Sequence, residues 1–143
     1  MVSALSSAPA TERVAYSRLL WVGPLAIVAA VVANLIVRAV AVAALRPDPR
    51  FMPLSLVMPI VFTTIGVLGA TIVYAVVGRF SRRPVTLFRQ IALVTLVVSL
   101  IPDLLLLGGG MPGASIATVA PLIAMHVVAW AIAVRLLTTL ARA

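Results

Sequence analysis

The sequence contains no cysteine and no lysine, and only three of its 143 residues are acidic. Without cysteine, disulfides, iron–sulfur clusters, thiolate zinc sites and thiol nucleophiles are excluded. Glycine-rich phosphate loops, paired carboxylates, HExxH spacing and the Gly-x-Ser-x-Gly elbow are also missing. We therefore expect no catalytic, cofactor or metal site, and a chain that is not an enzyme.

Apolar residues dominate what is present. They make up 64% of the chain, against about 45–50% in soluble domains. Charged residues make up 10%, against about 25% in soluble domains. A fold in water cannot cover so much apolar surface, so the composition indicates a membrane protein.

Four apolar runs are long enough to cross a bilayer of about 30 Å as helices. Short segments rich in proline, glycine or arginine separate them, and such segments end one helix and start the next. The sequence predicts an all-α integral membrane four-helix bundle, arranged up-down-up-down, within residues 19–143. The expected helices are about 21–45, 54–77, 87–107 and 116–137.

Residues 1–18 are rich in serine, alanine and threonine and show no sustained apolar period, so they are expected to form a flexible cytoplasmic lead. The alternative is a cleaved signal peptide. The apolar run that follows is too long for a signal peptide and contains Asn34 and Arg38, which favours an uncleaved first helix.

Arginine is distributed unevenly between the two sides of the predicted bundle. Because positive charge accumulates in cytoplasmic loops, the bias predicts cytoplasmic N- and C-termini in a bacterial inner membrane. The cytoplasmic side holds Arg13, Arg18, Arg79, Arg82, Arg83, Arg89, Arg135 and Arg142, and the outer loops hold only Arg46 and Arg50. Topology and anionic lipid headgroups account for this charge, so the lipid bilayer is the expected partner and nucleic acid is not.

Each predicted helix carries a face of small or polar residues spaced three or four apart, as expected where membrane helices approach closely. These faces predict a polar cluster inside the bundle, and its candidate members are Asn34, Arg38, Thr63, Ser99, Asp103 and His126. Prolines in the outer helix halves suggest an outward-facing vestibule that ends near Asn34, Thr63 and His126.

An ion pair between Arg38 and Asp103 is the sharpest structural hypothesis, because lone charges inside a membrane are costly. The alternative is that Arg38 extends towards the interface while Asp103 caps its helix, so that they never meet. His126 is expected to bond Asn34, Ser99 or a backbone carbonyl, with proton transfer as the functional alternative. A triad of His126, Ser99 and Asp103 is not expected, because two of the three share one helix.

The run Leu20-Trp-Val-Gly-Pro-Leu-Ala26, together with Asn34 and Arg38, resembles small uncharacterised bacterial four-helix membrane proteins. The resemblance implies the fold and the inner membrane, and no established activity. Small multidrug-resistance exporters also have four short helices, but the glutamate of their first helix has no counterpart here.

The leading interpretation is a non-enzymatic accessory or interaction protein, either homo-oligomeric or bound to another membrane protein. The alternative is a small oligomeric carrier or channel with an outward-facing polar vestibule. An intramembrane enzyme is the remaining class, and it would need a bound cofactor.

Overall fold

The computed structural model describes residues 12–143, and this part of the chain is helical apart from its turns and one isolated β-bridge, between Val14 and Arg142. The expected all-α fold with four long helices is confirmed. Those helices are α1 (Tyr16–Leu45), α2 (Val57–Phe80), α3 (Pro84–Leu105) and α4 (Ile116–Leu140), with short 3-10 turns η1 (Met52–Leu54) and η2 (Leu106–Gly108).

The helix boundaries follow the expected breakers, with shifts of a few residues. α3 begins at Pro84, where a proline is tolerated because the first amide of a helix has no acceptor. α1 begins at Tyr16, within the segment expected to be flexible. Residues 1–11 of that segment lie outside the described residues. Next to it, the amide of Ala15 donates to the carbonyl of Ala141 and that of Ala143 to the carbonyl of Arg13, so the chain just before α1 is held against the end of α4.

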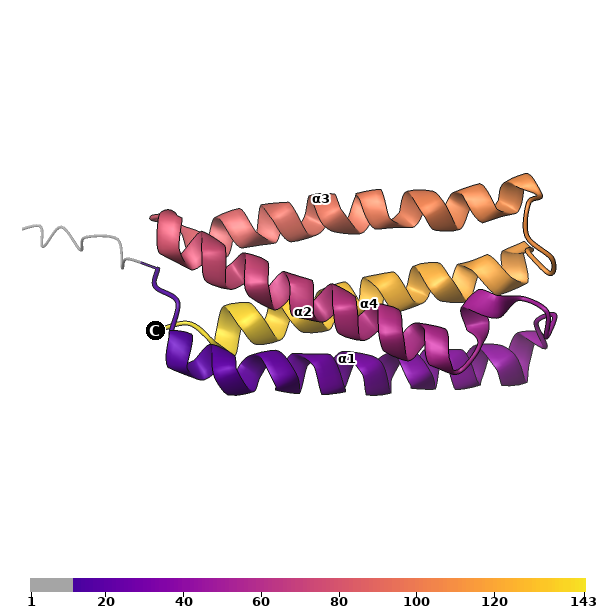
Figure 1. The fold of residues 1–143 in the computed structure, drawn as a ribbon, viewed down its shortest axis with the longest axis horizontal. Helices are drawn as coiled ribbons and strands as arrows, with labels where there is room; N and C mark the ends of the chain where they lie inside the picture. Colours follow the sequence, from indigo (N-terminus) through magenta and orange to yellow (C-terminus); the bar gives the residue numbers. More distant parts are fainter. Residues whose placement is uncertain (1–11) are drawn as a thin grey trace, which may run out of the picture.

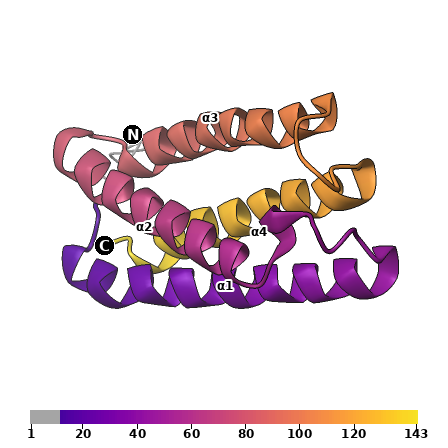
Figure 2. The ribbon, with the colours of Figure 1, turned by 45° about the vertical axis from the view of Figure 1, so that its right-hand side comes forward.

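The connections lie at the two ends of the bundle (Figure 1). We call the end with residues 12–15, 81–83 and 141–143 the terminal end, and the end with residues 46–56 and 106–115 the loop end. α1 packs against α2 and α4, whereas α3 lies across the bundle from α1. α2 and α3 meet at the terminal end and diverge towards the loop end, as Figures 1 and 2 both show.

Small side chains let α1, α2 and α4 approach closely at mid-length, and their core consists of Ala26, Ala30, Val67 and Ala133. Larger side chains fill the core at the terminal end, where the rings of Tyr74 and Phe88 lie 4.9 Å apart. Large apolar side chains cover the outside of all four helices, each of which is long and apolar enough to cross a membrane. The surface is therefore suited to lipid.

α3 is the least buried helix. Its buried residues are Pro84, Val85 and Phe88 near its start and Asp103 near its end. Every residue between Phe88 and Asp103 is exposed or only half-buried. The middle of α3 thus stands away from the tightly packed α1, α2 and α4.

Candidate functional site

Asn34 and Thr63 join α1 to α2 inside the bundle. The Asn34 amide donates to the Thr63 hydroxyl at 2.8 Å, and the two residues are only 2% and 8% exposed. Asn34 Oδ1 is buried and has no hydrogen-bond partner among the described residues. Because both side chains are enclosed, the expected vestibule does not reach this pair.

Arg38 does not pair with Asp103, and that hypothesis is wrong. Its Nε donates to the carbonyl of Leu54 at 2.8 Å. Leu54 ends the 3-10 turn η1, where a carbonyl has no further helical donor. α1 and α3 lie diagonally across the bundle, so an ion pair between them would have to pass between α2 and α4.

Asp103 instead lies against His126 of α4. Its Oδ2 is 3.0 Å from His126 Nδ1, which is also 2.9 Å from the carbonyl of Leu122. Because both neighbours are acceptors, we assign the proton to Nδ1. The N–H is aligned with the Leu122 carbonyl, which leaves Asp103 Oδ2 buried and without an aligned hydrogen bond among the described residues. The carboxylate therefore makes an electrostatic contact.

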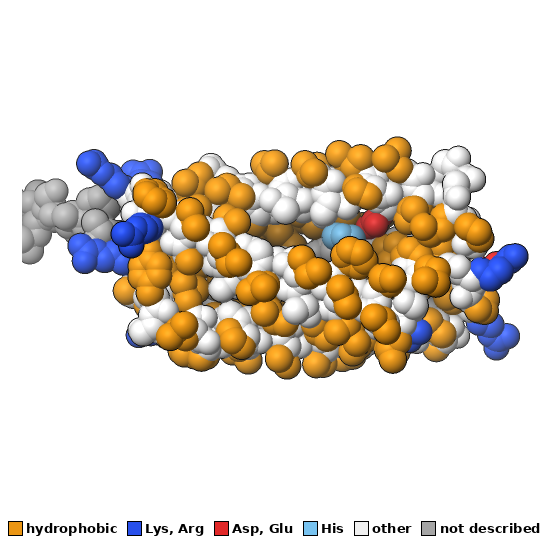
Figure 3. Space-filling model, in the orientation of Figure 1, with side chains coloured by type: hydrophobic (Ala, Val, Ile, Leu, Met, Phe, Trp, Pro, Cys, Tyr) orange, Lys and Arg blue, Asp and Glu red, His pale blue; other side chains and the backbone are white. Residues whose placement is uncertain are grey.

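The Asp103–His126 pair is open on one side. The Asp103 side chain is 11% exposed and that of His126 is 38% exposed. Figure 3 shows the pair in a hollow of the surface between α3 and α2, surrounded by apolar side chains. Since Nδ1 faces Asp103 and Leu122, the rest of the imidazole ring is the part that reaches this hollow.

Two other polar side chains near the pair do not join it. The Ser99 hydroxyl donates to the Leu96 carbonyl of its own helix at 2.7 Å. The Trp130 indole, one turn beyond His126 on α4, has a buried N–H with no acceptor among the described residues. Within residues 12–143, no three histidine or acidic side chains gather as metal ligands would. The arrangement can hold a proton or bind a polar group, but it presents no activated nucleophile.

Sequence reasoning missed the role of Glu12. Its carboxylate accepts from the amides of Val85 and Thr86, at 3.1 and 3.4 Å. An anion is favourable there because the first amides of a helix are unpaired and its dipole is positive. Glu12 precedes α3 by 72 positions, so only the fold brings the cap to the helix.

Comparison with known proteins gives a family without an activity. No curated protein and no solved structure matches the chain. The model of DUF6069, a family of unknown function, matches residues 14–143, nearly the whole chain. This confirms the resemblance to a small uncharacterised family, and the chain therefore belongs to DUF6069.

Proposed function

We propose that this chain is a non-enzymatic accessory protein of the bacterial inner membrane that binds another transmembrane helix along its open side. In this proposal the chain crosses the bilayer in up-down-up-down order with both termini in the cytoplasm. The arginine bias supports the orientation, because eight arginines lie at or near the terminal end, whereas the loop end has two in its connection and Arg38 inside α1.

The observation that carries the proposal is the exposure of a polar pair amid apolar surface. His126 is 38% exposed on its side chain and adjoins a carboxylate, between helices of membrane length. A charged residue at the centre of a membrane helix costs about 2.5–3.5 kcal/mol on insertion scales, so such groups face protein or water. A helix packed between α2 and α3 would cover the pair and also the unburied middle of α3.

A small oligomeric carrier is the second candidate, and the same open pair favours it. A carrier needs a wet polar path that reaches His126. The enclosed Asn34–Thr63 bond supports the accessory interpretation instead, because it takes two of the expected polar residues out of any such path.

Because the chain lacks cysteine, one introduced thiol can carry a photoreactive benzophenone to a chosen position. Ser99→Cys places it on the inner side of α3, and Ile36→Cys is the control on the exposed side of α1. In native membranes we expect a discrete protein adduct from position 99 and only lipid adducts from position 36. An adduct of twice the chain mass would identify a second copy as the partner.

The carrier interpretation predicts a different result. Membrane-impermeant thiol reagents would then reach Ser99→Cys from the aqueous side, and no adduct with a different protein would form. That outcome would overturn the accessory proposal.

A further inference from the structure

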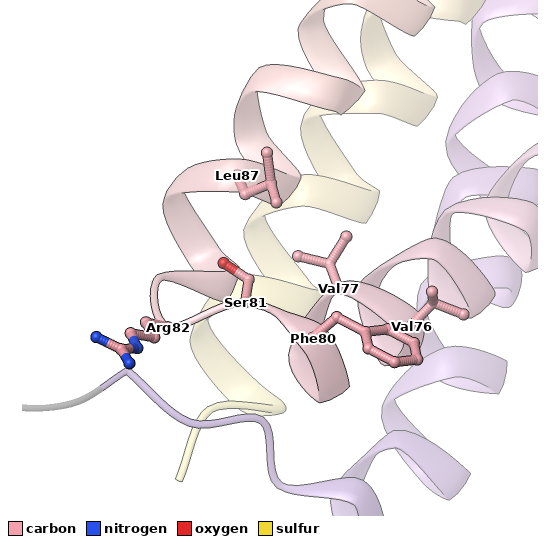
Figure 4. A pocket seen from close by; sticks show the side chains of 6 residues that line it. All are labelled: Val76, Val77, Phe80, Ser81, Arg82 and Leu87. Carbon is pink, nitrogen blue, oxygen red and sulfur yellow. The ribbon is translucent and has the colours of Figure 1, made fainter.

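Two adjoining clefts lie at the turn between α2 and α3, and both are lined by Ser81 and Arg82. The first, of about 370 Å³, has apolar walls formed by Val76, Val77, Phe80 and Leu87. Figure 4 shows Val77 and Leu87 facing each other across it, with the Arg82 guanidinium directed away from the apolar side chains. The second, of about 580 Å³, carries charged side chains beside apolar surface, and it is lined also by Glu12, Arg13, Val14, Tyr16 and Gly78.

We propose that the two clefts bind one anionic phospholipid. An acyl chain lies in the first cleft, the phosphodiester lies between Ser81 and Arg82, and the headgroup extends into the second cleft, towards its charged side chains. A guanidinium suits this position because it binds phosphate oxygens with two parallel hydrogen bonds. An apolar cleft that meets a cleft with charged side chains at a shared arginine matches the chemistry of a lipid with a charged phosphate.

The Ser81 hydroxyl is free to donate to a phosphate oxygen. Its oxygen accepts from the amide of Arg83 at 3.1 Å, within the turn before α3. No acceptor for the hydroxyl proton is seen among the described residues, so the proton can serve a ligand.

The positive charge of Arg82 is not neutralised by the protein's own acidic side chains. The chain has three of them, and none forms an ion pair with Arg82 among the described residues, although Glu12 lines the same cleft. Glu12 accepts from the first amides of α3, Asp48 pairs with Arg50, and Asp103 lies against His126. The exposed Arg82 guanidinium, which lies at the edge of the apolar cleft and points away from its walls, is thus left for an anion from the membrane.

This inference does not depend on the proposed helix partner, which would bind elsewhere along the bundle. Its test is native mass spectrometry of the purified chain in detergent with added phosphatidylglycerol. The variants are Arg82→Gln and two controls, Arg79→Gln and Arg83→Gln. All three remove one charge near the same turn, but only Arg82 lines the clefts.

We expect the wild type and both controls to retain one phosphatidylglycerol molecule. Arg82→Gln should weaken binding about tenfold or more, the loss expected for one charge-assisted hydrogen bond. Leu87→Ser, which makes the acyl cleft polar, should weaken binding as well. Unchanged thermal unfolding midpoints without added lipid would show that the variants remain folded.

Three outcomes would overturn the proposal. An equal loss of phosphatidylglycerol binding in all three arginine variants would indicate that the lipid is attracted diffusely to the positive surface. Equal binding of the zwitterionic phosphatidylcholine would show that the net negative charge of the lipid is not recognised. Displacement of the lipid by inorganic phosphate or glycerophosphoglycerol at similar concentration would show that the site takes a free anion and that the acyl cleft contributes nothing.

Discussion

Asp103 Oδ2 lies 3.0 Å from His126 Nδ1, and this contact joins α3 to α4 near the end of α3, beyond its unburied middle. We expect Asp103→Ala and His126→Ala to be coupled, because each single change leaves a charged or polar partner in an apolar setting. Thermal unfolding in detergent should give a coupling energy of about 1 kcal/mol, within the range for contacting residues.

The matched control for this cycle is Arg38→Ala with Asp103→Ala. These residues belong to diagonal helices, so their effects should add to within about 0.5 kcal/mol. Coupling between Arg38 and Asp103, with none between Asp103 and His126, would contradict the observed pairing.

Arg38→Gln should loosen the loop end locally. Arg38 Nε donates to the Leu54 carbonyl at 2.8 Å, and loss of a partner for a buried backbone group costs about 1–3 kcal/mol. Hydrogen exchange should accelerate in the peptide that covers residues 52–58, where η1 leads into α2. Exchange in the second half of α4 should not change, and faster exchange there would point to global destabilisation instead.

The helix interiors were predictable from the sequence because their determinants are local. Apolar length, Pro84, the Arg46–Arg50 segment and the glycines from Gly108 mark the helices without reference to other parts of the chain. The start of α1 was not predictable, since it depends on the bridge between Val14 and Arg142 at the other end of the sequence.

Polar faces identified the residues of the candidate site, but not their partners. Their similar depth in the membrane suggested that Arg38 pairs with Asp103. In the fold, however, α3 packs against α4 and not against α1, so Asp103 lies beside His126. Which helices are adjacent depends on packing of the whole bundle. A backbone carbonyl was among the partners expected for His126, and Leu122 provides it.

Gly78→Ala should detach the segment before α1. A Cβ at position 78 would lie 2.5 Å from Val14 Cγ2 and 2.8 Å from Val14 Cβ, so Val14 must move. Trypsin should then cut after Arg13 faster than in the wild type.

Gly66→Ala is the control for that substitution. No atom lies within 4 Å of a Cβ at position 66, so the change should be neutral or stabilise by up to about 1 kcal/mol through helix propensity. Equal cleavage of the two variants would contradict the role assigned to the Val14 contact.

Asp48 should remain ionised in acid. Hydrogen bonds from Arg50, one of them 2.7 Å long, lower the pKa of Asp48 from its ordinary 3.8 to about 2. Because the folded-state pKa is the lower one, the contribution of this pair to stability is complete above pH 3.8 and is lost as the pH falls through about 2. Carboxyl NMR titration should show this pKa, and Arg50→Gln should raise it towards 3.8.

The buried bond between Asn34 and Thr63 also bears on how the chain enters the bilayer. The two residues lie in α1 and α2, which are joined by a short connection. Their hydrogen bond therefore requires no contact with α3 or α4. A helical hairpin that leaves the insertion machinery as a unit can bury these two polar side chains against each other from the start. We therefore expect α1 and α2 to integrate as a pair, with the asparagine shielded from lipid throughout assembly.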